Sequence, residues 1–146
     1  MTSPLTGLLA VAAVLVAATV FGLVRRSRDG RLRAAPAAPE AAVFAGLGVE
    51  MGTPVTLLQF SSRFCAPCRA THALCATIAA EVEGVRHLEI DAESHLDAAR
   101  ALHVRRTPTL FVLDGAGRVV RRATGVPARA ELRAAVDDAL AVRGVR

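Results

Sequence analysis

The sequence predicts an α/β domain, in which a mixed β-sheet is sandwiched by helices, behind a single N-terminal transmembrane helix. Three observations lead to this prediction. Residues 5–24 form an uncharged apolar run. From about residue 41, short apolar segments alternate with segments whose apolar residues recur at helical spacing, as in α/β proteins. The chain has 146 residues, enough for one compact domain beside the apolar run and too few for two.

The apolar run from Leu5 to Val24 has the length of a membrane span. As a helix, its 20 residues would extend about 30 Å, the thickness of the hydrocarbon core. A cleaved signal peptide would carry positive charge before a shorter run, whereas this run follows no charged side chain and ends on Arg25 and Arg26. We therefore predict that residues 1–24 anchor the chain in the lipid bilayer, with a single span over residues 5–24.

Positive charge is concentrated directly after this run. The net charge is +5 and every basic residue is Arg, five of them within nine positions: Arg25, Arg26, Arg28, Arg31 and Arg33. The positive-inside rule then predicts a cell-membrane protein whose domain faces the cytoplasm, although large domains sometimes override this bias. Beyond residue 33 the charges nearly cancel, and Trp and Tyr are absent, which excludes nucleic acid as a partner. Residues 25–40, rich first in Arg and then in Ala and Pro, are interpreted as a linker.

Residues 41–146 are predicted to form the folded domain, and its first half has the order strand, helix, strand. The apolar segment 55–60 is a strand, and residues 66–83 are helical, with Gly84 as the stop signal. Residues 85–91 alternate as a second strand. A short edge strand is also expected at 42–44.

The second half is predicted to contain a helix, a hairpin and a last helix. Ser94 and Asp97 resemble a capping box for a helix through residue 102. Strands over 109–113 and 118–124 flank a turn rich in glycine. Pro127 is expected to open the last helix, whose inner face would carry Leu132, Ala135, Val136, Ala139 and Leu140.

The chemistry of the chain is indicated by Cys65 and Cys68, which follow the first strand and open the first helix. A spacing of three puts both side chains on one side of a helical turn, close enough for a disulfide. Free N–H groups and the helix dipole favour the reactive thiolate there. Cys65, which is nearer the end, is the expected nucleophile, and Cys68 would then attack the mixed disulfide and release the product.

The cysteines and histidines also admit other interpretations. Cys65, Cys68, His72 and Cys75 could suggest zinc, but in one helix Cys65 and Cys75 would be about 15 Å apart, too far for one ion. We therefore expect no metal and no organic cofactor. Cys75 is interpreted as a small buried hydrophobe, with a third redox thiol as the alternative. The four histidines, His72, His87, His95 and His103, show no ligand spacing and are expected to be ordinary polar residues.

With these motifs in place, residues 54–142 resemble the thioredoxin family. Beside the cysteine pair, Thr107 and Pro108 resemble the family's cis-proline segment, and Gly117 and Gly125 fall where the family keeps turn and groove glycines. The resemblance implies a thioredoxin-like fold. It also implies that Phe64, Ala66, Pro67, Thr107, Pro108 and Gly125 shape the substrate groove.

The chain departs from the family pattern near the second cysteine. The family's buried acid, one residue before Phe60, is Gln59 here, and its lysine partner on the next strand corresponds to His87. Phe64 replaces the usual Trp. Gln59 can form hydrogen bonds but cannot accept a proton at neutral pH, so the buried thiol must lose its proton by another route.

The resemblance implies a membrane-tethered thiol–disulfide oxidoreductase that acts on cysteine-containing proteins and is recycled by an external reductant or oxidant. Two alternatives stay open. The domain could lie outside the cytoplasm and act on exported proteins. It could instead be a non-catalytic module that binds peptides or acts as a holdase, which the loss of the buried acid would favour.

Overall fold

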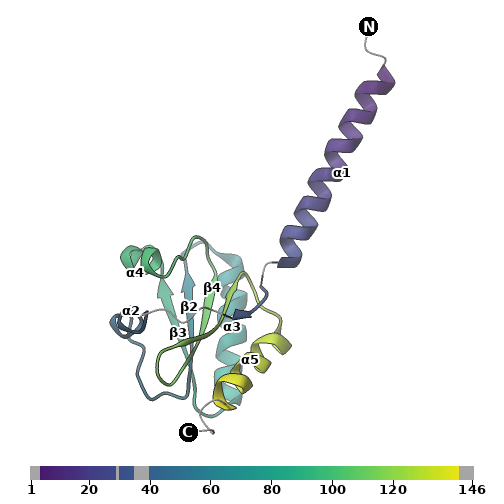
Figure 1. Ribbon diagram of the computed structural model, residues 1–146. Coiled ribbons are helices and arrows are strands. Elements are labelled where there is room, and N and C mark those ends of the chain that lie inside the picture. Colours follow the sequence, from purple (N-terminus) through teal and green to yellow (C-terminus); the bar gives the residue numbers. More distant parts are fainter. Residues whose placement is uncertain (1–3, 29, 35–39, 142–146) are drawn as a thin grey trace.

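A computed structural model describes residues 4–28, 30–34 and 40–141 of the chain (Figure 1). The predicted linker lies partly outside these residues, at 29 and 35–39. The elements are α1 (Pro4–Arg28), β1 (Arg33–Ala34), α2 (Ala41–Gly46), β2 (Val55–Ser61), α3 (Ala66–Glu81), β3 (Val85–Asp91), α4 (Leu96–Ala101), β4 (Thr109–Asp114), β5 (Val119–Thr124) and α5 (Arg129–Ala141).

The five strands form one mixed sheet in the order β1-β5-β4-β2-β3. Strand β2 runs parallel to β3, to which α3 connects it, and the other neighbouring strands are antiparallel. All seven residues of β2 are buried, because strands flank it on both sides and helices cover both faces. This position explains why its sequence is an apolar run without polar alternation.

Two apolar clusters lie on opposite faces of the sheet, so the predicted sandwich is confirmed. Helices α3 and α5 pack on one face, together with Val55 and Leu57 of β2. Helices α2 and α4 cover the other face, together with Leu58 and Phe60. Since side chains alternate along a strand, Gln59 shares the α3 face with Val55 and Leu57.

The edge strand expected at 42–44 is wrong. These residues lie in helix α2, and the ring of Phe44 is fully buried against that of Phe111, with 5.6 Å between the centroids. A segment of three apolar residues is too short to distinguish the periodicity of a helix from that of a strand. The edge of the sheet is instead β1, whose two residues fall in the predicted linker and pair with β5.

The capping box expected at Ser94 and Asp97 is also wrong. Helix α4 begins at Leu96 and has no side-chain cap, because the Ser94 hydroxyl donates to the Asp91 carboxylate at 2.7 Å. Helix α5 begins at Arg129, two residues after the expected Pro127. Apart from the end of α1, the boundaries of the other predicted strands and helices agree with the structure to within two residues.

Helix α1 continues to Arg28, four residues beyond the predicted span. Its segment Gly7–Val24 is long and apolar enough to cross a membrane, and none of that segment is buried against the rest of the chain. Figure 1 shows α1 projecting away from the folded domain.

Candidate functional site

The two cysteines lie where β2 gives way to α3. Cys65 is the N-cap residue of α3, with an extended backbone, and its Sγ accepts a hydrogen bond from the Cys68 N–H at 3.1 Å. Pro67 lies in the first helical turn, where a missing N–H costs nothing. The local sequence thus begins the helix at the residue that carries the first sulfur.

Cys65 and Cys68 form a disulfide, with an S–S distance of 2.03 Å and a Cα–Cα distance of 5.1 Å. The two sulfurs differ in their access to solvent. Cys65 is partly exposed, whereas Cys68 is only 2% exposed. Cys65 Sγ is therefore the sulfur of the pair that is nearer to solvent, and Cys68 is shielded from it.

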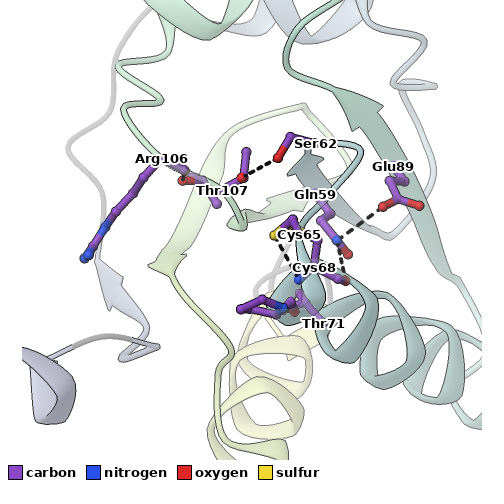
Figure 2. Close-up of a disulfide and its surroundings, with 10 residues drawn as sticks. Gln59, Ser62, Cys65, Cys68, Thr71, Glu89, Arg106 and Thr107 are labelled. Atoms are coloured by element: carbon purple, nitrogen blue, oxygen red, sulfur yellow. Dashed lines mark hydrogen bonds between the residues drawn. A yellow bond between two sulfur atoms is a disulfide. The ribbon is translucent and has the colours of Figure 1, made fainter.

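A loop before β4 borders the disulfide (Figure 2). The Thr107–Pro108 peptide bond is cis, and the hydroxyls of Thr107 and Ser62 lie 3.0 Å apart in a hydrogen bond. The Pro108 carbonyl accepts from the N–H of Gly125, which has a φ of +91°. Because Ser62 precedes the disulfide by three residues, these contacts hold the proline loop beside it.

The residues around Cys65 leave its surroundings open. Phe64 is 99% exposed, and Ala66 and Pro67 are also exposed. A fully exposed aromatic ring beside a partly exposed sulfur is a surface that a partner chain could cover.

The Gln59 side chain, fully buried, links the second cysteine to the neighbouring strand. Its Nε2 donates to the Cys68 carbonyl at 2.9 Å and to Glu89 Oε1 at 3.4 Å. Gln59 and Glu89 are direct partners in the β2–β3 register. Figure 2 shows the amide between the disulfide and the Glu89 carboxylate.

His87, at the position of the family's lysine, does not supply a positive charge at neutral pH. Burial, and to a lesser degree the neighbouring His72, lower its pKa to about 4, and the charge of Glu89 offsets this only in part. Its Nε2 is buried without a hydrogen-bond partner, and its ring packs edge-on against His72 at 4.9 Å.

Sequence reasoning missed the pair formed by Glu89 and His72, whose Nδ1 lies 2.8 Å from Glu89 Oε2. Two signals could have found it. Glu89 follows His87 by two residues, which places both on one face of a strand, and His72 follows Cys68 by four, which places both on one side of a helix. His95 and His103 flank the two ends of α4.

Cys75 is a free thiol, fully buried in the cluster between α3 and the sheet. Burial, with a smaller contribution from the charge of Glu89, raises its pKa to about 12. The thiol form therefore dominates throughout the physiological pH range.

A disulfide at the start of the helix after a central strand, beside a cis-proline loop, defines the class of thioredoxin-fold proteins. A sequence model of the thioredoxin family matches residues 48–138. This is more than half of the chain, which therefore belongs to the thioredoxin family. No curated protein matches the chain significantly.

The chain resembles many solved structures, including the following three. A mutant thioredoxin from Halobacterium salinarum NRC-1 has a TM-score of 0.54 and 24% identity, covering 60% of this chain and 76% of its own. Thioredoxin NaTrxh from Nicotiana alata has a TM-score of 0.53 and 20% identity, covering 66% and 80%. A structure from work on thiol resolution in yeast mitochondrial 1-Cys peroxiredoxin has a TM-score of 0.56 and 16% identity, covering 65% and 88%. At these identities the likeness shows the fold alone.

Proposed function

We propose that this protein is a membrane-tethered thiol–disulfide oxidoreductase that exchanges disulfides with cysteine-containing proteins. One observation carries the proposal: a disulfide at the start of α3 joins a partly exposed sulfur to a buried one. This is the arrangement that a two-step exchange requires, because the intermediate must be reachable from outside and resolvable from inside.

In the reducing direction, the Cys65 thiolate attacks a substrate disulfide, forming a Cys65–substrate bond and releasing the first substrate sulfur as a thiolate. Cys68 then loses its proton and attacks Cys65 Sγ, which restores the Cys65–Cys68 bond and releases the second substrate thiolate. Two electrons pass from the dithiol to the substrate, and the released thiolates take up protons from solvent. No metal or organic cofactor is needed, and an external reductant or oxidant recycles the pair.

The groove residues take their proposed roles from their position around Cys65. Phe64, Ala66 and Pro67 would meet the substrate chain on one side of the sulfur. Thr107, Pro108 and Gly125 would meet it on the other, held there by the Ser62 and Gly125 hydrogen bonds. Helix α1 would span the bilayer, and the Arg cluster after it would keep the domain on the cytoplasmic side.

A comparison of Cys68→Ser with Cys65→Ser tests the chemistry. Only Cys68→Ser should accumulate a mixed disulfide with a disulfide-bonded substrate, because it keeps the attacking sulfur and lacks the resolving one. Equal trapping by both variants would refute the assignment of roles. Protease treatment of intact cells separates the cytoplasmic orientation from its alternative, in which the domain would be digested.

The replacement of the buried acid by Gln59 keeps a non-catalytic peptide-binding or holdase module as a second candidate. Reduction of a protein disulfide by the purified chain in stoichiometric single turnovers excludes it. Peptide binding without any reduction would support it.

A further inference from the structure

An open cavity of about 670 Å³ adjoins the disulfide and connects Cys68 to a carboxylate outside the family's usual position. Both cysteines line it, as do Arg69 and His72 of α3 and Glu89 and Asp91 of β3. Because Gln59 cannot accept a proton, another group must take the proton of Cys68 when this cysteine resolves the mixed disulfide. That group must be free to accept a proton and adjacent to the second cysteine.

Two of the titratable groups on β3 are poorly suited. Hydrogen bonds from the Ser94 hydroxyl and the Glu93 N–H lower the pKa of Asp91, which makes its carboxylate a weaker base. His87 is not among the residues that line the cavity. Glu89 lines the cavity and is connected to the second cysteine, because its Oε1 shares the Gln59 amide with the Cys68 carbonyl.

We propose that Glu89 accepts the proton of Cys68 during resolution, directly or through one water in the cavity, and that His72 positions it. The His72 ring, half-exposed and 2.8 Å from Glu89 Oε2, connects the carboxylate to solvent. The step balances: Cys68–SH and Glu89–COO⁻ become Cys68–S⁻ and Glu89–COOH, and solvent then removes the proton. This inference rests on the proposed function and names its proton acceptor.

Charged groups of both signs line the cavity around Glu89, namely Arg63, Arg69 and Asp91. His87, on the same strand, is neutral at pH 7 because burial lowers its pKa to about 4.

The test uses the full-length reduced chain and 5,5′-dithiobis(2-nitrobenzoate). Attack by Cys65 releases one coloured thiolate, and resolution by Cys68 releases a second, so stopped-flow absorbance separates the two steps. In Glu89→Gln we expect an unchanged first phase and a second phase slowed about 10- to 100-fold at pH 7. The defect should shrink as the pH rises, because hydroxide can then remove the proton in place of Glu89.

Glu89→Asp should recover part of the second-phase rate, and Glu93→Gln, which removes an exposed carboxylate that does not line this cavity, should leave both phases unchanged. A Glu89→Gln second phase equal to that of the unmodified chain at every pH would overturn the inference alone. Absence of any second phase in the unmodified chain would instead refute the proposed exchange function.

After α1, the chain is attached to the domain beside the substrate groove. This attachment limits which substrates the dithiol can reach. The Gly30 N–H donates to the Thr124 carbonyl at 2.6 Å, and the next residue, Gly125, donates to Pro108 at 2.8 Å. Because Arg33 and Ala34 are paired with β5, the segment after them cannot act as a longer tether. Figure 1 shows α1 leaving the domain close to this part of the sheet.

Chain length then limits the reach of the dithiol. Val24 ends the apolar segment and α1 ends at Arg28. Even a fully extended chain spans at most about 22 Å over the six steps from Val24 to Gly30, and the path from Gly30 through Thr124 and Gly125 to Pro108 adds about 10 Å. We infer that the substrates are membrane proteins whose cysteines lie within about 30 Å of the bilayer. This inference rests on the proposed membrane tethering.

Proteoliposomes containing the full-length reduced chain test this limit. The probes are single-span peptides that carry a mixed disulfide with thionitrobenzoate, either five residues beyond the span or at the end of a 40-residue helical stalk, about 60 Å long. The near probe should react at least 10-fold faster, and the difference should vanish in detergent. Equal rates in vesicles would overturn the inference. Loss of the protein from carbonate-washed membranes would instead refute tethering.

Discussion

Cys75 should be inert in the folded, reduced protein. Its pKa is raised from 9.0 to about 12, chiefly by burial. At pH 8 an ordinary thiol of pKa 9.0 is about 10% thiolate, whereas Cys75 would be about 0.01% thiolate. Because the thiolate is the nucleophile, alkylation of Cys75 should be about 1000-fold slower than that of an unperturbed exposed thiol. Because Cys75 is fully buried, the reagent can reach it only when the structure opens locally, which slows the reaction further.

The assay is alkylation of the reduced chain with iodoacetamide at pH 8, followed by mass spectrometry of each cysteine peptide. Cys65 should react first, and Cys75 should react only after urea is added. A Cys75→Ala variant should keep both phases of disulfide exchange. If native Cys75 is labelled at a rate within 10-fold of that of a free thiol, the reasoning is refuted and the alternative, that Cys75 is a third redox thiol, is favoured.

Three further predictions concern stability, measured by urea unfolding. Phe111→Ala should cost about 3–5 kcal/mol, because that ring is 1% exposed between two other aromatic rings. Asp114→Asn should cost about 1–3 kcal/mol at pH 7, because Asp114 accepts three hydrogen bonds. Burial alone would raise the pKa of Asp114, but these bonds lower it below 3.8, so its contribution is present above about pH 4 and the deficit should disappear as pH falls through the folded pKa. Gly30→Ala should destabilise more than Gly48→Ala, since both have positive φ but only at Gly30 would the new Cβ meet a backbone carbonyl, that of Val126.

The corrections to the predicted elements share one cause. Ser94 has a capping residue's chemistry, but its hydroxyl bonds Asp91, which precedes it by three residues at the end of β3. The 42–44 segment has no periodicity of its own, and its conformation follows from burying Phe44 against Phe111, far along the chain. In both cases a tertiary or turn contact outweighed a weak local preference.

The amino-acid sequence by itself determined the position of the dithiol, the order of most elements and the apolar N-terminal helix, because each depends on residues a few positions apart. The pairing of Gln59 with Glu89, the approach of His72 and the attachment of Gly30 beside the proline loop were decided only by the tertiary structure. These contacts join residues 17 to 94 positions apart. Their geometry depends on strand register and helix packing, which are set by the fit of the whole core and not by any local pattern.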